Sequence, residues 1–140
     1  MLTMTEAHRL AIVAHALDGL PLEACGLIVG RRLDAESVDA VVTRFVPTEN
    51  EAQSAKVYTV PAIALLRTER DAEDDGEEIL GVVHSHTHTE GYPSPTDIRQ
   101  APDPQWHYVI ISLRDGGTAM RSYRIVDGAV IEEPILVNGE

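Results

Sequence analysis

The sequence contains little sulfur and few cations. A single cysteine, Cys25, cannot form an intramolecular disulfide, so the fold cannot depend on an oxidising compartment. Eleven Lys and Arg residues stand against 23 Asp and Glu residues, which gives a net charge of -12. Because binding to a nucleic-acid backbone needs clustered cations, we expect no nucleic-acid partner.

Long hydrophobic runs are also missing. No stretch approaches the roughly 18 apolar residues of a membrane span, and the apolar residues between positions 10 and 20 are interrupted by His15, Asp18 and Gly19. We therefore expect neither a membrane segment nor a targeting sequence, and we predict a cytoplasmic protein. With 140 residues, 44% of them hydrophobic, the chain is predicted to form a single domain over residues 1–140 with a proper core.

Hydrophobic periodicity and turn residues predict two helices among several strands. Thr5 can cap a first helix over residues 6–18, and Leu10, Val13, Ala14 and Leu17 would form its apolar face. A second helix is predicted over residues 61–72. Strands are predicted over residues 27–29, 40–46, 56–60, 79–83, 106–113, 119–126 and 129–137. The strand over 106–113 is apolar throughout and should be central, whereas Pro134 places the last strand on an edge. These elements predict an α/β fold with a mixed central sheet flanked by helices.

Potential ligands are densest just after the strand predicted over residues 79–83. His84 and His86 are two residues apart, so strand geometry would direct both imidazoles to one side. Ser94 is suited to cap a short helix with Pro95 at its first position, which fixes Asp97 in the first turn. The Asp97 carboxylate could then fold back over the strand end as a third ligand.

Two histidines and one carboxylate with a free position for water are the ligands of a catalytic zinc site. Structural zinc sites have four protein ligands, and the single cysteine favours the open type. Non-heme iron oxygenases also use two histidines and one carboxylate. The ligand types alone leave both metals open.

The pattern of these residues resembles that of the JAMM (MPN-plus) zinc metalloproteases. It consists of His84-x-His86, seven further residues and Ser94-x-x-Asp97, with Glu23 upstream at the start of an apolar strand. Proteins of that family cleave isopeptide and peptide bonds next to ubiquitin-like proteins. The resemblance implies the layered JAMM/MPN fold, which is cytidine-deaminase-like. It also implies zinc bound by His84, His86 and Asp97, with Glu23 as general base and Ser94 as donor to the oxyanion. An iron oxygenase has no use for Glu23 or Ser94 at these positions.

One departure from the family pattern points to a narrower branch. The usual proline after the second histidine is replaced by Thr87. Residues 23–26, 84–94, 107–109 and 121–128 look like those of the bacterial sulfur-carrier-protein cysteine hydrolases of the CysO type. This resemblance implies the substrate: a ubiquitin-like sulfur carrier protein whose C-terminal glycine is amide-linked to cysteine. Hydrolysis would release free cysteine for cysteine biosynthesis, and the glycine-ending tail would reach the zinc as a strand added to a sheet edge.

Other functions remain open at this stage. The chain could process other ubiquitin-like carrier precursors or conjugates, or it could be a non-catalytic MPN scaffold that only binds such partners. Among the remaining candidates, His88 lies on a loop and could be a transient or outer ligand. His107 opens a buried strand and is expected to be a core histidine. Cys25 is expected to be a small buried hydrophobe, with a Cys-His peptidase as the alternative.

Overall fold

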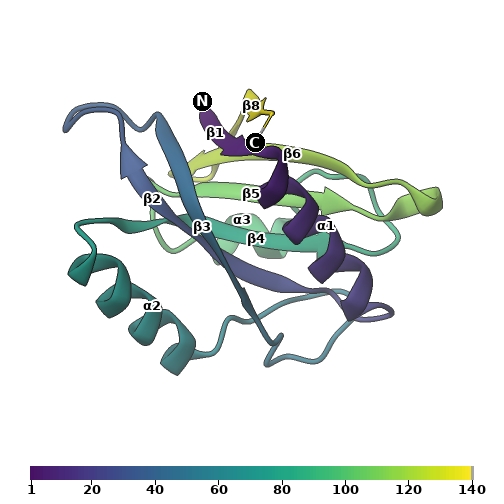
Figure 1. Ribbon diagram of the computed structural model, residues 1–140. Coiled ribbons are helices and arrows are strands. Elements are labelled where there is room, and N and C mark those ends of the chain that lie inside the picture. Colours follow the sequence, from purple (N-terminus) through teal and green to yellow (C-terminus); the bar gives the residue numbers. More distant parts are fainter. Residues whose placement is uncertain (140) are drawn as a thin grey trace.

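The computed structural model describes residues 1–139, which form an eight-stranded mixed sheet with helices on its faces (Figure 1). The strands are β1 (Leu2–Thr5), β2 (Cys25–Arg32), β3 (Ala40–Thr48), β4 (Glu78–His86), β5 (His107–Ser112), β6 (Ala119–Val126), β7 (Ala129–Glu133) and β8 (Ile135–Asn138). The helices are α1 (Glu6–Gly19), α2 (Ala62–Asp74) and α3 (Pro95–Arg99), with a 3-10 turn, η1 (Arg114–Gly116). The predicted α/β class with a mixed sheet flanked by helices is confirmed.

The strand order is β7-β6-β5-β4-β2-β3-β1-β8, which puts β4 and β2 in the middle of the sheet. β2 pairs antiparallel with β3 and β4, while β4 and β5 run parallel. Every residue of β5 is buried, as expected for a strand with partners on both sides and both faces covered. The prediction of an interior strand over residues 106–113 is therefore confirmed.

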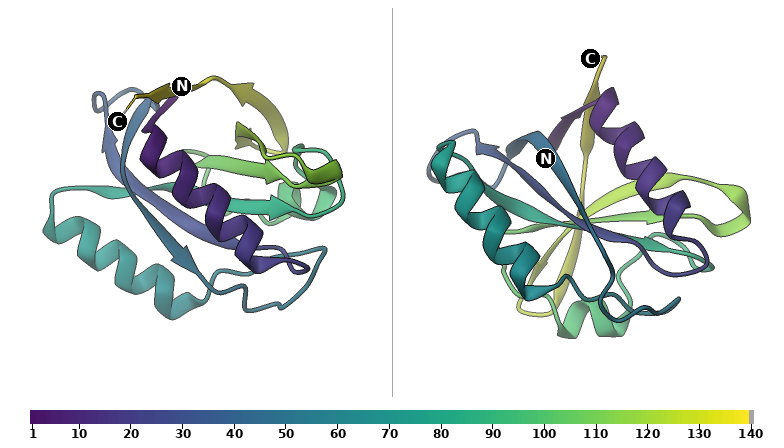
Figure 2. Two further views of the ribbon diagram at one scale, coloured as in Figure 1. Left: turned by 45° about the vertical axis from the view of Figure 1, so that its right-hand side comes forward. Right: turned by 60° about the horizontal axis from the view of Figure 1, so that its bottom comes forward.

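The C-terminal strand differs from the prediction. Residues 129–137 were expected to form one strand, but Pro134 divides them into β7 and β8. β7 pairs with β6 at one end of the strand order, and β8 pairs with β1 at the other. Because one residue separates the two strands, the two ends of the sheet must come together there, and Figure 2 shows β8 beside the N-terminal strand. β1 was not predicted; it is short and is held by β3 and β8.

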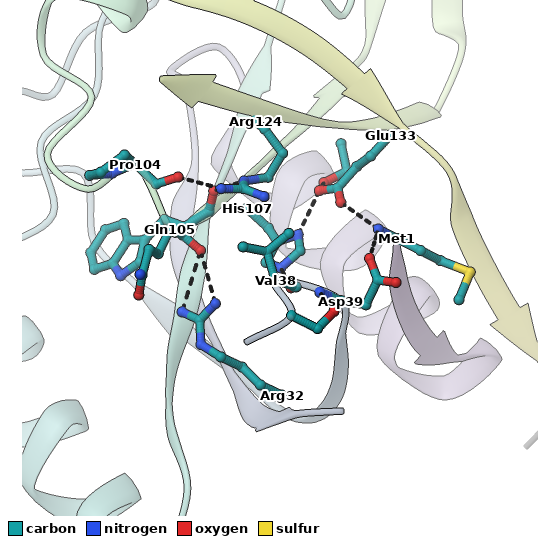
Figure 3. Close-up of polar contacts among 12 residues, drawn as sticks. Met1, Arg32, Val38, Asp39, Pro104, Gln105, His107, Arg124 and Glu133 are labelled. Atoms are coloured by element: carbon teal, nitrogen blue, oxygen red, sulfur yellow. Dashed lines mark hydrogen bonds and ion pairs between the residues drawn. The ribbon is translucent and has the colours of Figure 1, made fainter. Parts of the chain in front are cut away.

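A buried polar network ties the two ends of the sheet together (Figure 3). His107 Nδ1 lies 2.5 Å from Glu133 Oε2, and the Ser122 hydroxyl donates to the same oxygen at 2.7 Å. The other ring nitrogen of His107 lies 2.7 Å from the carbonyl oxygen of Val38. His107 is thus a satisfied core histidine, as predicted. It pairs with Gly81 in the parallel β4–β5 ladder, away from the end of β4 that carries the other buried histidines.

Helices α1 and α2 cover opposite sides of the sheet and pack on separate hydrophobic clusters (Figures 1 and 2). The Thr5 cap of α1 is confirmed, since its hydroxyl accepts a hydrogen bond from the His8 amide at 3.1 Å. The predicted apolar face is only partly right: Val13 packs against the core, but Leu10 and Leu17 are 52% and 47% exposed. The fully buried residues of the helix are Ile12 and Ala16. α1 follows β1 directly, and Ile12 and Ala16 lie in the same core cluster as Leu2 and Met4 of β1.

The segment before α2 also departs from the prediction. Residues 56–60 were expected to form an edge strand but are irregular. The Asn50 side chain bonds this segment instead, donating to the Val57 carbonyl at 3.0 Å and accepting from the Thr59 amide at 2.9 Å. Among residues 1–139, no helix is long and apolar enough to cross a membrane.

Candidate active site

The two central histidines lie at the end of β4, a strand held by β2 on one side and β5 on the other. Strand alternation directs His84 and His86 to the same face, and their Nε2 atoms lie 3.1 Å apart. Both residues are buried. The predicted pair of convergent imidazoles is therefore present, with its backbone fixed by the middle of the sheet.

The first turn of α3 brings a carboxylate to these nitrogens. The Ser94 hydroxyl accepts from the Asp97 amide at 3.1 Å, and Asp97 Oδ2 accepts from the Ser94 amide at 2.9 Å. This reciprocal capping box fixes the carboxylate. Asp97 Oδ2 also lies 3.1 Å from His84 Nε2 and 3.2 Å from His86 Nε2. One oxygen thus caps the helix and faces both imidazoles, as the sequence predicted.

The three groups have the chemistry of a metal-binding site. The ligand atoms of His84, His86 and Asp97 lie within 4.8 Å of one another. Burial lowers the pKa of His84, which favours the neutral imidazole that a metal requires. Burial opposes ionisation of Asp97, but hydrogen bonds with the two histidines outweigh it and hold the pKa of the carboxyl well below its usual value. The site therefore offers two imidazole nitrogens and one carboxylate oxygen to a cation.

The two imidazoles are oriented in different ways. His86 Nδ1 lies 2.8 Å from the carbonyl oxygen of Glu90, the kind of outer hydrogen bond that fixes a metal-ligating histidine. His84 Nδ1 is buried and has no hydrogen-bond partner among the described residues. Its ring is instead stacked on Tyr58, with centroids 4.2 Å apart and an interplanar angle of 19°. Tyr58 escaped the sequence analysis because its segment was assigned to an edge strand.

Glu23 lies two residues before Cys25, the first residue of β2, which pairs with His84. Its side chain is buried, and Oε1 has no hydrogen-bond partner within residues 1–139. Burial raises the pKa of this carboxyl to about 8. The charge of His86 acts to lower the pKa, and the negative charge of Asp97 acts to raise it. An unpartnered buried carboxylate under the electrostatic influence of the metal-binding groups is suited to contact a water or a substrate atom, so the residues present fit a metal site of the catalytic type.

The remaining candidates do not join this cluster. His88 is exposed on the loop after β4, and His107 belongs to the network at the opposite end of the strands. The Cys25 thiol is buried, donates to the Glu49 carbonyl at 3.4 Å and lies 3.4 Å from the Thr48 hydroxyl oxygen. Burial raises the pKa of this thiol, which disfavours the thiolate that a Cys-His peptidase needs. Cys25 is thus the small buried residue that was expected.

A family model described as prokaryotic homologs of the JAB domain matches residues 5–126. The chain belongs to this prokaryotic JAB family. The predicted resemblance to the JAMM (MPN-plus) proteins is thereby confirmed.

Relatives of this JAB protein include named peptidases. The CysO-cysteine peptidase of Mycobacterium tuberculosis is 44% identical over 128 residues, which cover 91% of this chain and 84% of that protein. A probable TtuB-protein conjugate cleaving protease of Thermus thermophilus is 31% identical over 126 residues, covering 88% of this chain and 75% of that protein. A solution structure of a Desulfitobacterium hafniense protein superposes with a TM-score of 0.89 at 37% identity, covering 100% of this chain and 94% of that one.

Proposed function

We propose that this JAB protein is a zinc peptidase that hydrolyses the amide bond between the C-terminal glycine of a ubiquitin-like sulfur carrier and cysteine, releasing free cysteine. The observation that carries the proposal is the convergence of His84, His86 and Asp97 beside the unpartnered carboxylate of Glu23. The 44% identity to a CysO-cysteine peptidase supports the substrate class.

His84, His86 and Asp97 would hold the zinc. With three protein ligands, a catalytic zinc site would keep a further position for a water or a substrate oxygen. Bound zinc would make a water molecule more acidic and polarise the scissile carbonyl. Ferrous iron would accept the same ligands, but an oxygenase has no use for a buried carboxylate and a hydroxyl beside them. The presence of Glu23 and Ser94 therefore favours hydrolysis.

Glu23 is proposed as the general base. Its carboxylate would accept a proton from the attacking water and return it to the leaving amine. A carboxyl group whose pKa is raised toward neutrality can do both. Because Oε1 has no hydrogen-bond partner among the described residues, no other contact of that oxygen has to break before the proton transfer.

Ser94 is proposed to stabilise the oxyanion of the tetrahedral intermediate. Its hydroxyl oxygen accepts the hydrogen bond from the Asp97 amide, which leaves the hydroxyl proton for a different acceptor. Capping of α3 and donation to the substrate oxygen are therefore compatible. Donors of this kind contribute about 100- to 1000-fold to the rate of acyl transfer.

The partner would be a carrier protein with a flexible tail that ends in glycine. Backbone hydrogen bonds to an exposed sheet edge can hold such a tail in extended form, and glycine lets its backbone approach the site closely. Since the fold requires no disulfide, we propose that the reaction takes place in the cytoplasm.

Two other functions are weighed against this one. Cleavage of carrier precursors or carrier-protein conjugates is favoured by the 31% identity to a probable TtuB-protein conjugate cleaving protease. The same residues would perform that reaction on a larger leaving group. A non-catalytic MPN scaffold is disfavoured, because all three metal-binding residues and Glu23 are present together.

Mass spectrometry would test the proposal directly. A glycine-ending carrier with an amide-linked C-terminal cysteine is incubated with the protein, with and without a chelator. We expect the carrier to lose the mass of one cysteine residue, the chelator to block this loss, and zinc to restore it. An intact adduct after incubation with protein shown to hold zinc would refute the substrate and direct the search to carrier precursors and conjugates.

A further inference from the structure

The position of Glu23 depends on its backbone. The residue precedes β2, so it lies outside the regular ladder, and Oε1 of its side chain has no hydrogen-bond partner in the described part of the chain. A buried side chain without a fixed partner is placed by its main chain and by packing. The groups that hold the backbone of residues 23 and 24 therefore set where the carboxylate lies.

One side of this backbone is held by Ser85, the residue between the two histidines. The Ala24 amide donates to the Ser85 hydroxyl oxygen at 2.8 Å, and the Ser85 amide donates to the Ala24 carbonyl at 2.9 Å. Ser85 is fully buried. Since its neighbours on β4 are His84 and His86, these two bonds tie the main chain beside Glu23 to the strand that carries the metal-binding nitrogens.

The other side is held by the loop after β3. The Asn50 side-chain amide donates to the Glu23 carbonyl at 3.0 Å, and the Glu23 amide donates to the Ser54 carbonyl at 2.8 Å. Asn50 is itself anchored, since its side-chain oxygen accepts from the Ala52 amide at 3.0 Å. Both backbone polar groups of Glu23 are thus engaged by this loop.

We propose that Ser85 and Asn50 are positioning residues of the peptidase, which clamp the backbone from two sides and so set the Glu23 carboxylate beside the metal-binding group. The inference rests on the proposed function. It goes further in assigning an indirect catalytic role to two residues that touch neither metal nor substrate. Displacement of a catalytic group by about 1 Å can cost 100-fold in rate, so a small backbone shift at Glu23 should reduce turnover.

The test uses the zinc-loaded Ser85→Ala variant and the cysteine-adduct carrier. Removal of the hydroxyl leaves the Ala24 amide without its acceptor, and we expect kcat to fall about 10- to 100-fold. Zinc content should remain that of the wild type and KM should stay within about twofold. Hydrogen exchange of the Ala24 amide should become faster. Asn50→Asp removes the hydrogen bond donated to the Glu23 carbonyl from the opposite side, and it should lower kcat similarly while zinc content and KM stay near those of the wild type.

Ser122→Ala is the matched control, because Ser122 is equally buried and donates one hydrogen bond, to Glu133 in the network that closes the sheet. Ser122→Ala should lower the unfolding midpoint about as much as Ser85→Ala does, and it should leave kcat unchanged. In the Glu23→Gln background, Ser85→Ala should cause no further loss of rate. Wild-type kcat in Ser85→Ala, an equal loss in Ser122→Ala, or loss of zinc would overturn the proposal. A fully active Glu23→Gln protein would instead refute the base assignment on which it rests.

Discussion

The Glu133→Gln substitution should destabilise the protein strongly at neutral pH and weakly in acid. Burial alone would raise the pKa of this carboxyl, but hydrogen bonds from His107, Ser122 and the amino group of Met1 outweigh it. They lower the pKa from 4.5 to about 2. This difference corresponds to about 3 kcal/mol of folding free energy, at roughly 1.36 kcal/mol per pKa unit.

The sign follows from linkage. The folded-state pKa of Glu133 lies below its unfolded value, so the ionised group stabilises the fold above about pH 4.5 and loses this effect as the pH falls toward 2. Urea unfolding of the wild type and of Glu133→Gln at several pH values measures the difference. We expect Glu133→Gln to lower the free energy of unfolding by about 3 kcal/mol at pH 7 and by about 1 kcal/mol at pH 3.

Glu132→Gln is the control for this experiment. Glu132 is adjacent in sequence but exposed, and its ion pair with Arg121 spans 3.3 Å at the surface. Exposed pairs contribute about 0 to 1 kcal/mol, so this variant should change stability little at any pH. A Glu133→Gln effect that is independent of pH would show that ionisation of Glu133 is not the source of the stabilisation. An effect no larger than that of Glu132→Gln would show that the buried network does not stabilise the closure of the sheet.

Three further predictions concern the candidate active site. His84→Ala and Asp97→Ala should lose both zinc and activity. Glu23→Gln should keep zinc, and its rate should fall about 100- to 10,000-fold. Measurements of zinc content and of turnover distinguish the two outcomes. Ser94→Ala should retain zinc while kcat falls about 100- to 1000-fold, and an unchanged kcat would remove it from the mechanism. Tyr58→Leu should weaken zinc retention in a chelator competition, because the ring of His84 loses its stacking partner; wild-type retention would contradict that role.

The convergence of the three candidate metal ligands could be predicted because local rules set their geometry. His84 and His86 need only strand alternation to face the same way. Asp97 needs only the cap at Ser94 and Pro95 to be fixed in a first turn. These rules act over a few neighbouring residues, so the pattern of the sequence already contains them.

Features that depend on distant segments escaped prediction. The buried face of α1 includes the small Ala16 and the polar His15, whose Nε2 lies 2.8 Å from the Cys25 carbonyl oxygen. Large apolar residues lie on both sides of this helix, with Ile12 buried and Leu10 and Leu17 exposed, so their spacing does not identify the side that faces the sheet. The break at Pro134 and the pairing of β8 with β1 likewise depend on how the sheet curves, which no local pattern specifies.

The loop after β4 is irregular, yet residues from the sheet hold it through hydrogen bonds. The hydroxyl of Ser112 at the end of β5 donates to the Thr89 carbonyl at 2.7 Å, and the Tyr123 hydroxyl on β6 donates to the Gly91 carbonyl. These two bonds hold the carbonyl groups of the residues before and after Glu90, whose own carbonyl oxygen lies 2.8 Å from Nδ1 of His86. The orientation of the His86 imidazole on β4 therefore depends on a loop that residues of β5 and β6 hold in place. The ligand motif alone, on a strand without these neighbours, would not reproduce the site.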